Sequence, residues 1–81
     1  MIRMSTESAK LLLKCLKAHR PDMTWVVTSG EEVDIDQKLG NDLREAVGDE
    51  LISNGFKVDN NPTPYGLQLE SLIDEIGRLF I

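Results

Sequence analysis

The chain has one cysteine and one histidine, Cys15 and His19, and they stand four positions apart in a segment of helical periodicity. Residues at i and i+4 share a helix face, so this pair could act as nucleophile and base, or supply two ligands to a metal ion. A structural zinc site takes four ligands, and the sequence offers no second thiol or imidazole. We therefore predict a small core residue at Cys15 and a helix-end residue at His19, with no catalytic residue and no metal site.

Two acidic stretches have oxygen-bearing side chains at the spacing of a calcium-binding EF-hand loop. The first stretch has them at positions one, three, five and twelve: Asp59, Asn61, Thr63 and Glu70. Its sixth position, which must be glycine for the sharp turn of such a loop, is Pro64. The second stretch begins at Asp34 and has a cation, Lys38, at its fifth position. We therefore expect no bound calcium and no cofactor.

The size of the chain limits what it can enclose. Its 81 residues allow one domain, residues 1–81, and 41% of them are hydrophobic. A core of this size contributes only about 3–5 kcal/mol to stability, which makes a homodimer a reasonable expectation. A short helical chain has little room for a substrate pocket of about 300–1,000 Å³, and no phosphate-binding or nucleophile-elbow motif is present. We expect no enzymatic activity and no small-molecule substrate.

Apolar periodicity predicts a mainly α fold. Apolar residues recur at helical spacing in three segments, residues 5–19, 35–54 and 64–80. Ser5 and Thr63 are suitable N-caps for the first and third segments, and Pro64 then falls at the first helical position. Gly55 is suited to the left-handed position that follows a helix. The prediction is a small three-helix bundle, and the turn residues around Pro64 are explained as the start of a helix.

Two parts of this scheme stay open. Residues 23–35 contain a β-branched and aromatic run, which permits a short β-hairpin between the first two helices. The alternative is an ordered loop that covers the core with Trp25 and Val27. Within the second helix, Gly40 could break the element in two, and Gly48 could allow close approach of another helix.

The charges divide unevenly along the chain. Five of the nine basic residues, but only one of the fourteen acidic residues, lie in residues 1–20, and the net charge is −5. The remaining, acidic part is predicted to meet a basic protein surface. The acidic residues considered for this role are Glu31, Glu32, Asp34, Asp36, Asp42, Glu45, Asp49 and Glu50.

The C-terminal residues also indicate binding to a protein. The chain ends in Leu79, Phe80 and Ile81, which would need cover from a partner or from the rest of the molecule. We predict a non-catalytic protein-interaction protein, such as an adaptor, an inhibitor or an immunity-type protein, that binds another protein or itself. The runner-up is a nucleic-acid-contacting protein that uses three lysines on the polar face of the first helix: Lys10, Lys14 and Lys17. Nucleic acid is the less favoured partner because the whole chain is acidic.

The sequence also predicts a cytoplasmic location. No apolar run approaches the ~20 residues of a membrane-spanning helix, and "MIRMSTESAK" lacks the apolar core of a secretory signal. A single cysteine fits a reducing compartment.

Overall fold

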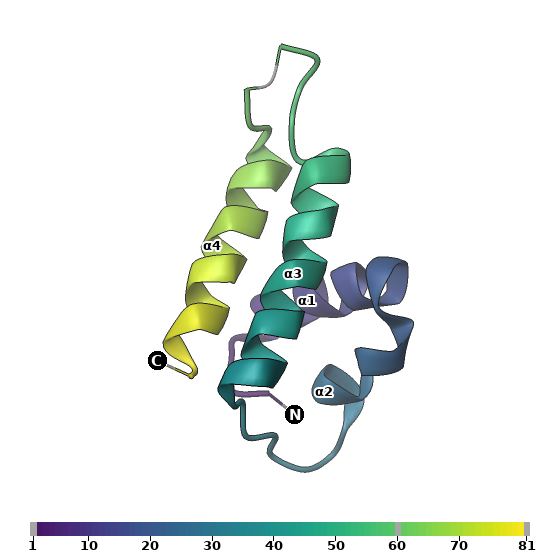
Figure 1. Ribbon diagram of the computed structural model, residues 1–81, viewed down its shortest axis with the longest axis vertical. Helices are drawn as coiled ribbons and strands as arrows, with labels where there is room; N and C mark the ends of the chain where they lie inside the picture. The colour runs from purple at the N-terminus through teal and green to yellow at the C-terminus, as the bar shows by residue number, and fades with distance from the viewer. Residues whose placement is uncertain (1, 60, 81) are drawn as a thin grey trace.

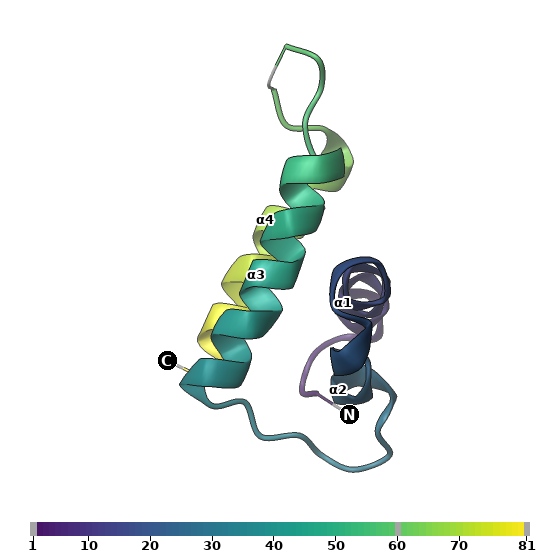
Figure 2. The ribbon, with the colours of Figure 1, turned by 45° about the vertical axis from the view of Figure 1, so that its right-hand side comes forward.

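The computed structural model describes residues 2–59 and 61–80 and is mainly helical, as the sequence predicts. Its elements are α1 (Thr6–His19), the 3-10 turn η1 (Pro21–Met23), α2 (Trp25–Thr28), α3 (Gln37–Asn54) and α4 (Pro64–Arg78). α3 and α4 lie side by side and antiparallel, and they make the most extensive contact in the molecule (Figure 1). α1 crosses this pair and is seen nearly end-on in Figure 2. α1 packs mainly on α3 and touches α4 less.

The core lies between the three long helices. Each contributes fully buried aliphatic side chains: Leu12 and Leu16 from α1, Leu43 and Val47 from α3, and Leu69 and Ile76 from α4. Ile2 closes one end of this core, and its N–H donates to the carbonyl of Val26 at 3.1 Å. The aliphatic character follows from the low aromatic content of the chain, which is 5%.

The helix starts follow local capping rules. Ser5 Oγ accepts from Ser8 N at 3.2 Å, and Thr63 Oγ1 accepts from Gly66 N at 2.9 Å, so both predicted N-caps are confirmed. α3 starts at Gln37, with the Asp36 carboxylate accepting from Leu39 N at 2.8 Å. One of the acidic residues assigned to a partner surface therefore has a local role in starting a helix.

The glycine predictions need correction. α3 continues unbroken through Gly40, where a Cβ atom would lie 2.3 Å from the ring of Phe80. The close approach thus occurs at Gly40, because the C-terminal aromatic ring needs that space. The prediction of close packing at Gly48 is wrong, since a Cβ there would meet nothing within 4 Å. Gly55 ends α3 with φ −93° and ψ −4°, so the left-handed conformation predicted for it is also wrong.

The β-hairpin considered for residues 23–35 is not formed. Among residues 2–59 and 61–80 no strand occurs, and the one isolated β-bridge joins Phe56 to Pro62. η1 and the single turn of α2 occupy this region instead, and the Thr24 carbonyl accepts from Val27 N at 3.0 Å. A helical turn satisfies its backbone locally, whereas a two-stranded hairpin exposes unpaired edges. Val27 is buried as expected, but Trp25 remains 49% exposed.

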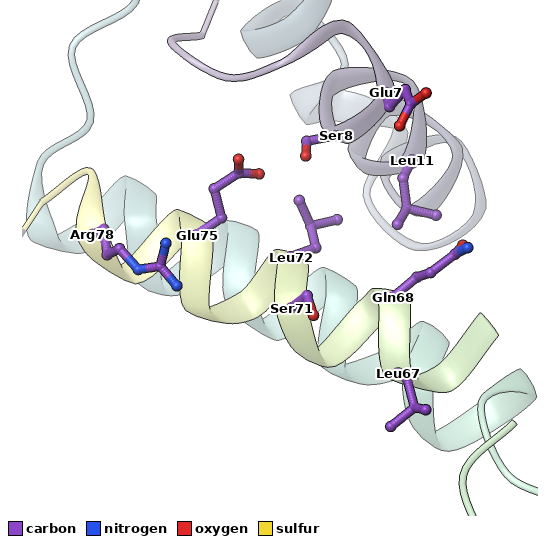
Figure 3. A pocket seen from close by; sticks show the side chains of 9 residues that line it. All are labelled: Glu7, Ser8, Leu11, Leu67, Gln68, Ser71, Leu72, Glu75 and Arg78. Atoms are coloured by element: carbon purple, nitrogen blue, oxygen red, sulfur yellow. The ribbon is translucent and has the colours of Figure 1, made fainter. Parts of the chain in front are cut away.

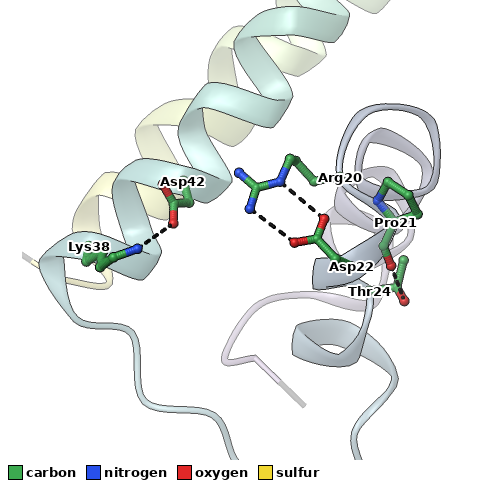
Figure 4. A network of polar contacts seen from close by, with 6 residues as sticks. All are labelled: Arg20, Pro21, Asp22, Thr24, Lys38 and Asp42. Carbon is green, nitrogen blue, oxygen red and sulfur yellow. Dashed lines mark hydrogen bonds and ion pairs between the residues drawn. The ribbon is translucent and has the colours of Figure 1, made fainter.

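Surface contacts hold the turn after α1 in place (Figure 4). Arg20 Nε and Nη2 donate to the two carboxylate oxygens of Asp22, each at 3.2 Å, and these hydrogen bonds lower the pKa of Asp22. Thr24 Oγ1 donates to the carbonyl of Pro21 at 3.2 Å. Local hydrogen bonds therefore join residues of the turn between α1 and α2.

Candidate functional site

A buried carboxylate, Glu50, lies where α1, α3 and α4 meet. Its residue is only 5% exposed. His19 Nε2 at the end of α1 lies 2.9 Å from Oε1, and Asn54 Nδ2 donates to the same oxygen at 3.1 Å. Tyr65 Oη in the first turn of α4 donates to Oε2 at 2.6 Å. One carboxylate thus accepts hydrogen bonds from side chains of all three long helices, and each of its two oxygens accepts at least one. We call these four residues the Glu50 cluster.

The Glu50 cluster keeps its carboxylate ionised. Burial on its own raises the pKa of Glu50, but hydrogen bonds from Tyr65, His19 and Asn54 outweigh it, and the pKa lies below its usual value. Burial and the hydrogen bond to Glu50 raise the pKa of Tyr65, so its hydroxyl stays protonated. Lys14 Nζ lies 4.5 Å from the centroid of the Tyr65 ring and covers it from outside. The cluster is a satisfied polar connection between helices.

Cys15 lies beside this cluster and is fully buried. Burial, followed by the charge of Glu50, raises the pKa of its thiol to about 11. A nucleophilic cysteine needs a lowered pKa, and the hydrogen bond of His19 goes to Glu50. In the described part of the chain, no three His, Cys, Asp or Glu side chains gather in a way that could hold a metal ion.

We expect slow thiol labelling of the folded protein. A rise of the Cys15 pKa from 9.0 to about 11 lowers the thiolate fraction at pH 8 about 100-fold, and burial slows access further. The rate of reaction with a disulfide reagent, compared between native protein and protein in denaturing urea, measures this effect. Equal rates in the two states would contradict the buried placement of Cys15.

We expect the contribution of Glu50 to stability to depend on pH. Because its folded pKa lies below the ordinary value of 4.5, the carboxylate stabilises the fold fully above that value. This contribution is lost as the pH falls through the folded pKa. The difference in unfolding free energy between wild type and Glu50→Gln should therefore shrink as the pH is lowered below about 5. Urea unfolding at a series of pH values tests this, and a difference that stays constant to about pH 3 would contradict it.

A groove opens between α1 and α4, which touch each other less than α1 and α3 do (Figure 3). Its volume is about 780 Å³, which lies within the range of substrate pockets for which a short helical chain was expected to have little room. The residues of α1 that line it are Glu7, Ser8 and Leu11. The residues of α4 that line it are Leu67, Gln68, Ser71, Leu72, Glu75 and Arg78. We call this the α1–α4 groove. In Figure 3, Leu72 and Glu75 point from α4 toward α1, and Leu11 points toward α4.

The predicted partner residues lie elsewhere and are mostly engaged within the molecule. Leu79 and Phe80 are half-buried and pack against the core, while Ile81 lies outside the described residues. Glu32 pairs with Arg3 on the surface. Glu31 and Asp34 are exposed on the loop before α3, and Asp36 is the cap of α3. The structure does not gather these residues with the C-terminal ones into a single site.

The lysines of the nucleic-acid alternative share the exposed side of α1. Lys10, Lys14 and Lys17 are all exposed, but Lys14 already lies over the ring of Tyr65. Binding of nucleic acid through these lysines stays a prediction.

Sequence reasoning missed the Glu50 cluster and the α1–α4 groove. Glu50 was placed among the surface acids, which is wrong because it is buried. A signal was present, since Glu50 stands seven residues after Leu43 and three after Val47, in the apolar stripe of its own helix. A carboxylate in such a stripe calls for buried hydrogen-bond donors, and His19 and Tyr65 supply them. No comparable sequence signal marks the groove, because it depends on how α1 crosses α4.

No helix in the described residues combines the length and apolar character needed to cross a membrane. Comparison with known proteins gives no family assignment: no protein-family model, no curated protein and no solved structure matches this chain significantly.

Proposed function

We propose that this chain is a non-catalytic protein-interaction protein that binds a helical segment of its partner in the α1–α4 groove. The observation that carries the proposal is the lining of this groove. Leu11, the 52% exposed Leu67 and the buried Leu72 give the groove an apolar lining. Three charged side chains also line it: Glu7, Glu75 and Arg78. An apolar strip with a charged rim is the usual form of a surface that receives an amphipathic helix.

The chemistry of the groove supports binding rather than catalysis. Its ionisable lining residues are Glu7, Glu75 and Arg78. The strongly shifted thiol of Cys15 is buried, and the half-buried Tyr65 hydroxyl donates to Glu50; neither residue lines the groove. Perturbed groups at the bottom of a cleft would favour an enzyme, and here the perturbed groups and the groove are separate.

The charge of the groove favours a basic partner segment. Glu7 and Glu75 outnumber Arg78 among its charged lining residues. The acidic loop before α3, with Glu31 and Asp34 exposed, adds to the negative potential of the molecule. Such a surface speeds encounter with a positively charged partner and sets its orientation.

Site-specific photo-cross-linking in the producing cells tests the proposal. A benzophenone amino acid at Gln68, which is exposed and lines the groove, should give a light-dependent covalent adduct with a protein chain. The matched control carries the same group at Glu45, an exposed position on α3 outside the groove, and should give none. No protein adduct at position 68, or equal adducts at both positions, would overturn the proposal.

A further inference from the structure

We infer that the helix received by the α1–α4 groove is α1 of a second copy of this chain, so that two copies associate about a two-fold axis near Leu11. This inference rests on the proposed function and names the partner for the same groove. A two-fold interface uses the same patch on both copies, so the patch must be complementary to itself in shape and in charge. The side of α1 that borders the groove meets both requirements.

The apolar part of this side contains two residues spaced seven apart on α1. Leu11, which lines the groove, and Ala18 lie on one helix–helix contact line, while Met4 stands before the extended N-cap Ser5, beyond the start of the helix. Leu11 is half-buried and Ala18 is exposed, so the line keeps apolar surface open to a partner. Two copies of α1 that lie antiparallel and cross at Leu11 would place Ala18 of each copy beside the N-terminal end of α1 of the other.

The charges on the same side are self-complementary in that arrangement. Glu7 lines the groove, and Lys14 lies two helical turns further along the same face, over Tyr65 of α4. Within one chain, seven residues separate them by about 10.5 Å along the helix axis, too far for an ion pair. In the antiparallel pair, Glu7 of each copy stands opposite Lys14 of the other, and the symmetry forms this contact twice.

The α4 wall adds to the attraction. α1 carries Lys10, Lys14 and Lys17 against one acidic residue, Glu7. Glu75 of α4 lines the groove and points into it, whereas Glu70 and Asp74 are exposed on α4 outside the groove, and Arg78 is the only basic residue of that helix. A second copy therefore brings the most basic helix of the molecule onto a groove whose acidic lining residues are Glu7 and Glu75. The chain itself contains the basic helical segment that the groove favours.

Sedimentation velocity of the purified full chain, from about 1 μM to 1 mM, tests whether a dimer forms. We expect a concentration-dependent dimer. Leu11→Glu sets two carboxylates against each other at the axis and should raise the dissociation constant about tenfold or more. Ile52→Glu is the control, because Ile52 is 76% exposed on α3 and does not line the groove, and it should leave the dimer unchanged.

A charge exchange tests the arrangement without disturbing the half-buried leucine. Glu7→Lys and Lys14→Glu should each raise the dissociation constant about tenfold, since each turns two attractions into two repulsions. The double variant should restore dimerisation, because the exchanged charges meet between copies. Far-UV circular dichroism of each variant checks folding, since Lys14→Glu also loses the contact with Tyr65.

The outcomes separate this inference from the proposed function. A monomer at all concentrations, together with an adduct from position 68 to a different protein, overturns the second-copy inference and leaves the proposed function intact. A monomer with no adduct at position 68 overturns both. If Leu11→Glu leaves the dissociation constant unchanged, or if the double variant does not restore dimerisation, the placement of α1 in the groove is overturned.

Discussion

Replacing Glu50 with alanine is expected to lower the free energy of unfolding by about 3 kcal/mol. The carboxylate accepts from His19, Asn54 and Tyr65, and its loss leaves three side chains at the meeting point of the helices without their acceptor. It also leaves a cavity at a residue that is only 5% exposed. A domain of this size has roughly 3–5 kcal/mol from its core, so most of the folding stability would be lost.

Urea unfolding followed by far-UV circular dichroism at pH 7 measures this effect. Glu45→Ala is the matched control, since Glu45 is an exposed glutamate on the same helix, and its replacement should change stability by less than about 0.5 kcal/mol. Tyr65→Phe removes one donor but leaves the carboxylate with two, and should cost about 1 kcal/mol. Equal stabilities of the Glu50 and Glu45 variants would contradict the role of the cluster as a buried connection.

The parts of the fold that follow short-range rules could be predicted from the sequence. Ser5 and Thr63 cap their helices because a hydroxyl at that position accepts a backbone N–H three residues later, whatever lies elsewhere in the chain. The apolar spacing in α1, α3 and α4 likewise depends only on the period of the helix. These local signals account for the three long helices and for four of their six ends; α3 begins at Gln37 and not at residue 35, and α4 ends at Arg78 and not at residue 80.

The remaining features depend on contacts between distant residues. Phe80 packs over Gly40, although forty residues separate the two in the sequence. The glycine that was expected to break a helix instead leaves room for this aromatic ring. His19 and Tyr65 come to Glu50 from two other helices, which no local pattern specifies. Residues 25–28 have β-forming side chains but fold as a helical turn, since α1 and the N-terminal segment offer burial for Val26 without a second strand.

Replacing Gly66 with alanine is expected to destabilise the protein by about 2–3 kcal/mol, although alanine is the better helix former by about 1 kcal/mol. Gly66 is buried in the first turn of α4, against the end of α3. A Cβ atom there would lie 2.0 Å from the carbonyl oxygen of Gly55 and 2.9 Å from its carbonyl carbon. Both atoms belong to the backbone, so no side-chain rotation relieves the overlap, and the two helix ends must move apart.

That movement would also cost hydrogen bonds. The Gly55 carbonyl accepts from Thr63 N at 2.9 Å and from Thr63 Oγ1 at 3.1 Å, and these bonds join the end of α3 to the start of α4. Tyr65 lies in the same turn, so its hydrogen bond to Glu50 would lengthen as well. We therefore expect Gly66→Ala and Tyr65→Phe to be non-additive, with the double variant less destabilised than the sum of the two.

Gly48→Ala is the matched control for this prediction. Gly48 lies in the middle of α3 with nothing within 4 Å of a Cβ atom, so alanine there should stabilise the protein by about 0.5–1 kcal/mol. The same substitution should thus have opposite signs at two helical glycines of one chain, as measured by urea unfolding. If both variants were stabilised, the junction of α3 and α4 would have to be looser than the contact between Gly66 and Gly55 requires. The expected coupling of this junction to the hydrogen bond between Tyr65 and Glu50 would then be contradicted as well.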